Sequence, residues 1–148
     1  MDLHEQCPVV FAAQSKQFFY CSDAVCEFVL RRGLVPIHPF KAFDYFLSDR
    51  VDRDLIRRAN FNIIRTVNEL WVFGREIANG VGAEIIYARE QEKPIRFFSI
   101  SARAEEIVEL SPKVLSLELE DDYDARQRDQ LVEILRGQHA REYGSSRR

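Results

Sequence analysis

Glu69-Leu-Trp-Val-Phe-Gly74, followed shortly by Gly80-Val-Gly82-Ala-Glu84, is the stretch of sequence that decides the fold. The apolar run from Leu70 to Phe73 is short and flanked by polar residues, which is typical of a strand covered on both faces. The residues that follow Glu84 resume an apolar pattern with helical spacing, so a helix is expected over about 81–92. Glu84 is therefore expected in the first turn of a helix, just beyond the carboxyl end of a parallel strand. Open α/β sheets place their ligands at such positions.

In the rest of the first hundred residues, the apolar pattern predicts alternating strands and helices. The apolar and turn patterns indicate further strands at 9–13, 34–37 and 95–100, and further helices at about 18–32 and 50–67. Gly33 is expected to end the first helix. Pro36 lacks a backbone donor, so the second strand is expected to lie at a sheet edge or to start late.

This order predicts an α/β fold in which right-handed crossovers build a parallel sheet with helices on both faces. We expect a flavodoxin-like three-layer sandwich with a four- to five-stranded, mainly parallel sheet and a C-terminal helix. Residues 8–100 would form the α/β domain, and residues 101–148 an extension packed on the same domain. In the extension, 105–110 is an edge strand or a helical turn, 114–119 extends the sheet, and 124–143 is an amphipathic helix before a disordered end.

Composition narrows the class of protein. At 148 residues the chain is long enough for one buried core, and its net charge of -3 provides no global attraction to polymeric nucleic acid or to an anionic membrane. No segment approaches the ~20 apolar residues that span a bilayer. The three cysteines lack a paired motif, so we expect reduced thiols and a cytoplasmic protein. A small-molecule partner is expected.

No metal or cofactor is predicted. The histidines are far apart, and no paired-cysteine motif is present. The acidic run 118–124 is explained by a solvated helix start, with Mg²⁺ binding as the alternative. Neither a Walker lysine loop nor a Gly-x-Gly-x-x-Gly motif follows the first strand, which disfavours an ATPase and a dehydrogenase.

The same residues carry a resemblance to a known family. Asn60 on a helix, the strand Asn68-Glu-Leu-Trp-Val-Phe-Gly74, the segment Asn79-Gly-Val-Gly82 with Glu84, and Lys93-Pro-Ile-Arg-Phe-Phe98 together resemble the nucleoside 2-deoxyribosyltransferase-like superfamily. This superfamily includes deoxynucleoside 5'-monophosphate N-glycosidases and uncharacterised bacterial proteins. The likeness covers roughly residues 8–100.

The resemblance implies roles for particular residues. Glu84 would be the nucleophile or the ion-pair partner of the sugar, and Gly80 with Gly82 would line the sugar or phosphate site. The substrate-binding loop after the first strand would contain Ala12, Gln14 and Ser15. Related proteins commonly form homo-oligomers, so a homodimer or higher homo-oligomer is expected.

Two features depart from the family pattern. Asn60 stands where the enzymes have an acidic residue, and asparagine cannot relay a proton as a carboxylic acid does. The loop after the first strand also lacks the glycines that admit a phosphate, for which Ser15 and Lys16 could compensate.

The other candidate residues each have a functional and a structural interpretation. His38 could contact a base or donate to a leaving group, or it could be a turn residue before Pro39. Asn60 and Asn79 could bind a hydroxyl, phosphate or base, or complete ordinary turns and helices. The aromatic residues Phe40, Phe43, Tyr45 and Phe46 form a base-stacking wall or belong to the core.

Three functions remain open on the sequence. The leading hypothesis is a nucleoside or nucleotide N-glycosidase or deoxyribosyltransferase-like enzyme. In it, the dipole of the helix N-terminus would keep Glu84 ionised near neutral pH, and that carboxylate would stabilise or trap the positive charge that develops on the sugar. The first alternative is a non-catalytic nucleotide-binding module of the same fold. The second is an interaction protein that acts through its C-terminal helix.

Overall fold

A computed structural model describes residues 1–43, 47 and 49–136 of the chain. Its main sheet contains β1 (Val9–Gln14), β2 (Val35–Ile37), β3 (Glu69–Phe73), β5 (Ile95–Phe98) and β6 (Glu109–Leu110), in the order β2-β1-β3-β5-β6. The strands β2, β1, β3 and β5 run parallel to one another, and β6 pairs antiparallel with β5. The predicted α/β class, the mainly parallel sheet and the edge position of β2 are confirmed.

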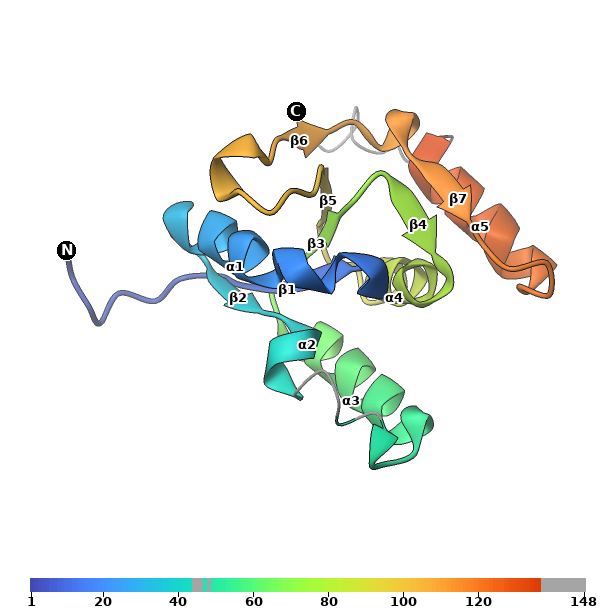
Figure 1. Cartoon of the computed structure of the whole chain (residues 1–148), viewed down its shortest axis with the longest axis horizontal. Helices are drawn as coiled ribbons and strands as arrows, with labels where there is room; N and C mark the ends of the chain where they lie inside the picture. The colour runs from blue at the N-terminus through green and yellow to red at the C-terminus, as the bar shows by residue number, and fades with distance from the viewer. Residues whose placement is uncertain (44–46, 48, 137–148) are drawn as a thin grey trace.

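Helices pack on both faces of this sheet (Figure 1). A 3₁₀ helix, Lys16–Cys21, leads into α1 (Ser22–Arg31), which covers the face that carries Trp71, Phe73 and Phe98. On the opposite face, α3 (Arg53–Thr66) and α4 (Asn79–Glu90) cover a core that includes Phe11, Val72 and Phe97. Because successive residues of a strand point to opposite faces, the apolar runs of β1, β3 and β5 supply both cores.

Several helix boundaries differ from the predicted ones. The segment predicted as one helix over 18–32 begins as a 3₁₀ helix, while Gly33 ends α1 with a φ of 83°, as predicted. The helix predicted from residue 50 begins at Arg53, because the Asp52 side chain accepts a hydrogen bond from the Asp54 N–H at 2.8 Å. Before it, Pro39–Ala42 forms the short helix α2.

The C-terminal extension adds a second, small sheet instead of a strand of the main one. β4 (Glu76–Ala78) pairs parallel with β7 (Ser116–Glu118), so the prediction that 114–119 extends the main sheet is wrong. Between β5 and β7, a 3₁₀ turn at Ala104–Glu106 precedes β6, and another lies at Pro112–Val114. The segment 105–110 therefore contains both structures that its sequence left open.

The last helix, α5 (Ala125–Arg136), packs on α4 and buries Leu131, Ile134 and Leu135, as predicted. The continuation of this helix to residue 143 and the disordered end predicted for 144–148 lie outside the described residues. No helix in the described part of the chain is long and apolar enough to cross a membrane.

Candidate functional site

A pocket of about 480 Å³ lies at the carboxyl end of β1, between α2, α3, the start of α4 and β7. β1 contributes Gln14, followed by Ser15 and Lys16. In a sheet of this order, the chain leaves β1 towards β2 on one side and returns to β3 on the other, which opens a crevice beyond the strand ends. The volume is within the range of small-molecule sites.

One face of α3 forms a wall of the pocket. Its lining residues recur at the spacing of one helical face: Arg53, Ile56, Arg57, Asn60 and Phe61. Arg57 is held by Asp54 through an ion pair of 2.9 Å, whereas Arg53 forms no ion pair with any described residue. The Asn60 Oδ1 atom is buried and has no hydrogen-bond partner among the described residues. A buried acceptor without a partner is costly unless a ligand or water supplies a donor.

Another wall of the pocket is formed by the N-terminus of α4. Asn79 and Gly80 line the pocket, and Ala78, which precedes them, provides no side-chain cap. The first turn contains no acidic residue, so its backbone N–H groups can satisfy an anion. The Asn79 Oδ1 atom accepts a hydrogen bond from the Glu120 N–H at 3.0 Å and so joins α4 to the chain after β7.

Glu84 lines the pocket, but its environment differs from the predicted one. Because α4 begins at Asn79, Glu84 lies in the second turn of the helix instead of the first. No hydrogen bond or ion pair joins its side chain to a described residue, and burial raises its pKa to about 8. The prediction that the helix dipole keeps Glu84 ionised near neutral pH is therefore wrong, since desolvation outweighs a dipole that is felt mainly in the first turn.

His38 does not line the pocket and instead fixes Gln14, which does. The His38 Nδ1 atom accepts a hydrogen bond from the Phe40 N–H at 3.2 Å, so Nε2 bears the proton and donates to the Gln14 Oε1 atom at 2.8 Å. Gln14 Nε2 then donates to the Phe18 carbonyl at 2.8 Å. His38 is 2% exposed, and its burial lowers its pKa to about 4. In the structure His38 therefore caps α2 and positions Gln14.

Two further predicted site residues lie away from the pocket. Ala12 is fully buried inside β1, in the core beneath α1. Gly82 faces α5, because a Cβ atom there would lie 2.8 Å from Leu131 Cδ1 and 3.1 Å from the Tyr123 hydroxyl. Gly82 is needed for close packing of α4 against the extension rather than for ligand access. The other predicted binding residues line the pocket: Gln14, Ser15, Asn60, Asn79 and Gly80.

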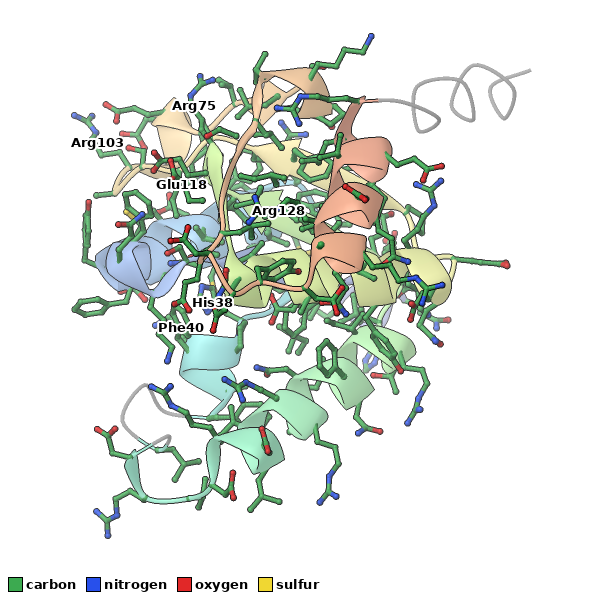
Figure 2. The ribbon with its side chains drawn as sticks, turned by 90° about the vertical axis from the view of Figure 1, so that its right-hand side faces the viewer. His38, Phe40, Arg75, Arg103, Glu118 and Arg128 are labelled. Carbon is green, nitrogen blue, oxygen red and sulfur yellow. The ribbon has the colours of Figure 1, made fainter. Side chains whose placement is uncertain are left out.

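The structure adds three charged residues that the sequence analysis did not select as binding residues: Arg53, Glu118 and Glu120. Arg53 brings a positive charge to the pocket, as does Lys16, which the sequence offered beside Ser15. Glu118 and Glu120 bring negative charges from β7 and the residues after it, and none of these four side chains forms an ion pair with a described residue. Figure 2 shows Glu118 on the β7 side, away from Phe40 on α2. The helical spacing of the α3 face could have indicated Arg53, but the long-range pairing of β7 hid the two glutamates.

Two of the four aromatic residues predicted before α3 lie among the described residues. Phe40 and Phe43 both line the pocket and are half-buried, so they can contact an apolar part of a ligand. Tyr45 and Phe46 lie outside the described residues.

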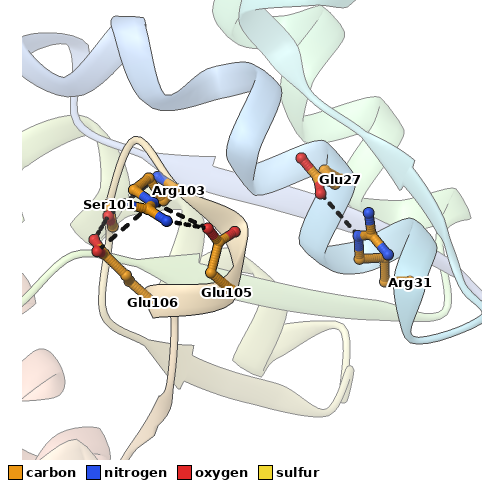
Figure 3. Close-up of polar contacts among 6 residues, drawn as sticks. All are labelled: Glu27, Arg31, Ser101, Arg103, Glu105 and Glu106. Carbon is orange, nitrogen blue, oxygen red and sulfur yellow. Dashed lines mark hydrogen bonds and ion pairs between the residues drawn. The ribbon is translucent and has the colours of Figure 1, made fainter.

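A second hollow of about 420 Å³ lies between α1 and the turn at Ala104–Glu106, and it differs in its charges. Among its lining residues, Arg31 pairs with Glu27 at 2.8 Å, and Glu105 pairs at 2.9 Å with Arg103, which lies outside the lining (Figure 3). These side chains neutralise one another, whereas Lys16, Arg53, Glu118 and Glu120 in the first pocket form no ion pair with a described residue.

Other chemistry is not indicated by the described residues. They contain no group of three or more histidine, cysteine or acidic residues that could hold a metal ion. The three cysteines are free, and burial raises the pKa of Cys21 and of Cys26. A raised thiol pKa disfavours the thiolate that nucleophilic catalysis requires.

Residues 10–98 match the model of a family described as a domain of unknown function, DUF7768. The chain belongs to this family. No curated protein matches the sequence. The DUF7768 segment extends from β1 to β5, so it includes every pocket residue except Glu118 and Glu120, which come from the extension.

Proposed function

We propose that the pocket binds a nucleoside or nucleotide and that Glu84 acts on its N-glycosidic bond, in a flavodoxin-like arrangement of the sheet and helices. The observation that carries the proposal is an unpaired carboxyl on the wall of a 480 Å³ pocket at the carboxyl edge of a parallel sheet. The resemblance of this segment to the nucleoside 2-deoxyribosyltransferase-like superfamily gives the carboxyl its expected target, the anomeric carbon.

The pocket offers a partner for each part of a nucleotide. Phe40 and Phe43 provide apolar surface for a ring of the nucleotide, and Asn60 has an acceptor free for a sugar hydroxyl. The positive charges of Lys16 and Arg53 support binding of an anionic group.

Cleavage requires the ionised form of Glu84. As the glycosidic bond lengthens, positive charge develops on the sugar ring, and a carboxylate stabilises that charge or forms an ester with the anomeric carbon. Water then releases the sugar. Because burial raises the pKa of Glu84 to about 8, we expect kcat/KM to rise by about tenfold per pH unit below pH 8 and to level off above it.

A second function is favoured by the protonated state of Glu84 at neutral pH. A protonated carboxyl donates a hydrogen bond but does not attack carbon, and Asn60 cannot supply a proton in its place. These features suit a module that binds a nucleotide without cleaving it.

The test is base release from a panel of nucleosides, deoxynucleosides and their 5'-monophosphates across pH 6–9. We expect release by the wild type and loss of release in Glu84→Gln, which keeps the side-chain shape. Glu90, exposed on the same helix, gives the matched control Glu90→Gln, which should retain activity. Thermal stabilisation by a nucleotide without base release would select the binding function, and equal release by Glu84→Gln would contradict the role of Glu84.

A further inference from the structure

Unpaired charges of opposite sign reach the pocket from different elements of the fold. Arg53 on α3 is positive, and Glu118 and Glu120 at β7 are negative. α3 and β7 lie on opposite sides of α4 (Figure 1). None of these side chains is neutralised by another described residue. A ligand that satisfies both walls has a negative group at one end and a positive group at the other.

The side chains around Glu84 also limit the leaving group. A neutral base departs from a sugar most readily when an acid protonates it. Asn60 cannot supply that proton, the single Nε2 proton of His38 is held by Gln14, and Glu118 and Glu120 have no proton to donate as carboxylates. Glu84 cannot both attack the anomeric carbon as a carboxylate and protonate the base. A base that already carries a positive charge leaves without a proton.

We propose that the substrate is a nucleotide whose base carries a fixed positive charge, such as a pyridinium or an N-alkylated purine, with the base towards Glu118 and Glu120 and the anionic group towards Arg53. This inference rests on the proposed function and names its substrate class. The bond between the anomeric carbon and the ring nitrogen breaks, and its electron pair neutralises the base. The Glu84 carboxylate forms an ester with the sugar, and water hydrolyses that ester, giving the free sugar hydroxyl and one proton.

The same substrate class explains how a buried carboxyl becomes reactive. A positive charge within a few ångströms favours the ionised form of a carboxyl group. A cationic substrate would therefore lower the pKa of Glu84 on binding and release its proton, whereas a neutral nucleotide would leave it protonated. Binding of the positively charged base would therefore itself convert Glu84 to the reactive carboxylate.

Matched pairs of compounds test this inference. Nicotinamide mononucleotide is compared with its reduced, neutral form, and 7-methylguanosine monophosphate with guanosine monophosphate. We expect base release at least about tenfold faster from the cationic member of either pair. Proton release on binding, measured by calorimetry in two buffers at pH 7, should accompany that member in the wild type and be absent in Glu84→Gln.

Binding separates recognition from chemistry. In Glu84→Gln, which is expected not to turn over, the cationic member should bind on the order of tenfold more tightly than its neutral partner. The double variant Glu118→Gln/Glu120→Gln should abolish this preference. The double variant Asp121→Asn/Asp122→Asn, which removes two exposed charges that do not line the pocket, should retain it.

The outcomes are distinct. Equal release and equal binding within both pairs would overturn the inference while the proposed function stands. If the variant Glu118→Gln/Glu120→Gln still binds the cationic member more tightly than the neutral one, the base does not lie towards Glu118 and Glu120. No release from these four compounds or from the panel above would overturn the proposed function and this inference with it.

Discussion

Replacing Glu84 by glutamine should change how the stability of the protein depends on pH. In the unfolded chain the carboxyl loses its proton near pH 4.5, but in the folded protein burial keeps it protonated to about pH 8. Between these values the folded state holds the additional proton, so raising the pH favours unfolding. The wild type is therefore expected to lose stability from pH 4.5 to 8, and Glu84→Gln to lose none from this source.

The size of the effect follows from the shift in pKa. A rise from 4.5 to about 8 corresponds to a cost of at most about 5 kcal/mol when Glu84 is fully ionised. Glu84 opens partly to the pocket, where water can relieve the charge, so we expect about 2–3 kcal/mol. The free energy of unfolding of Glu84→Gln should gain this amount on the wild type between pH 5 and pH 8.5.

Urea denaturation across this pH range measures the difference directly. His38 and the surface carboxyls titrate in both proteins, so their contributions cancel when the two curves are subtracted. Glu90→Gln, on the exposed side of the same helix, should follow the wild-type curve. A constant difference between Glu84→Gln and the wild type from pH 5 to 8.5 would refute a desolvated carboxyl at this position.

Three other perturbations test the architecture around the site. Gly82→Ala should lower the free energy of unfolding by about 1–3 kcal/mol, because its Cβ would lie 2.8 Å from Leu131. In thermal denaturation, the double variant with Leu131→Ala should lose less stability than the sum of the two single variants. Strict additivity of the two losses would show that the contact is absent. Burial lowers the pKa of His38 to about 4, so the wild type should lose stability as the pH falls from 6.5 to 4, and His38→Gln should lack this loss in urea denaturation at a series of pH values. Calorimetry should show that Arg53→Ala weakens the affinity for a nucleoside monophosphate about tenfold and leaves the affinity for the matching nucleoside nearly unchanged. An equal loss of affinity for both compounds would show that Arg53 does not bind the anionic group.

The strands that form the centre of the sheet could be predicted because their signals are local. β1, β3 and β5 are short apolar runs between polar or turn residues, and each is buried on both faces in the structure. Gly33 marked the end of α1 for an equally local reason, its positive φ.

The parts that were missed depend on contacts between distant residues. β4 is three residues long and is a strand only because β7 pairs with it about 40 residues later. That pairing draws Glu118 into the pocket and places α5 over Gly82. A glycine pair followed by a glutamate predicted a ligand-binding turn, but only the packing shows that Gly80 faces open space while Gly82 faces α5.

The protonation state of Glu84 also could not be predicted from the sequence. Its position near a helix start predicts an ionised carboxylate, but the ionisation depends on how many partners the folded chain leaves around it. No described residue pairs with it, and desolvation therefore decides its pKa.

The central claim is that Glu84 acts on an N-glycosidic bond. The most direct measurement is the rate of base release by the wild type and by Glu84→Gln on the same nucleotide, from pH 6 to 9. The account predicts a wild-type kcat/KM that rises to a plateau near pH 8 and a variant kcat/KM at least about a hundredfold lower at every pH. A variant as active as the wild type, or a wild type that binds nucleotides and never releases a base, would contradict it.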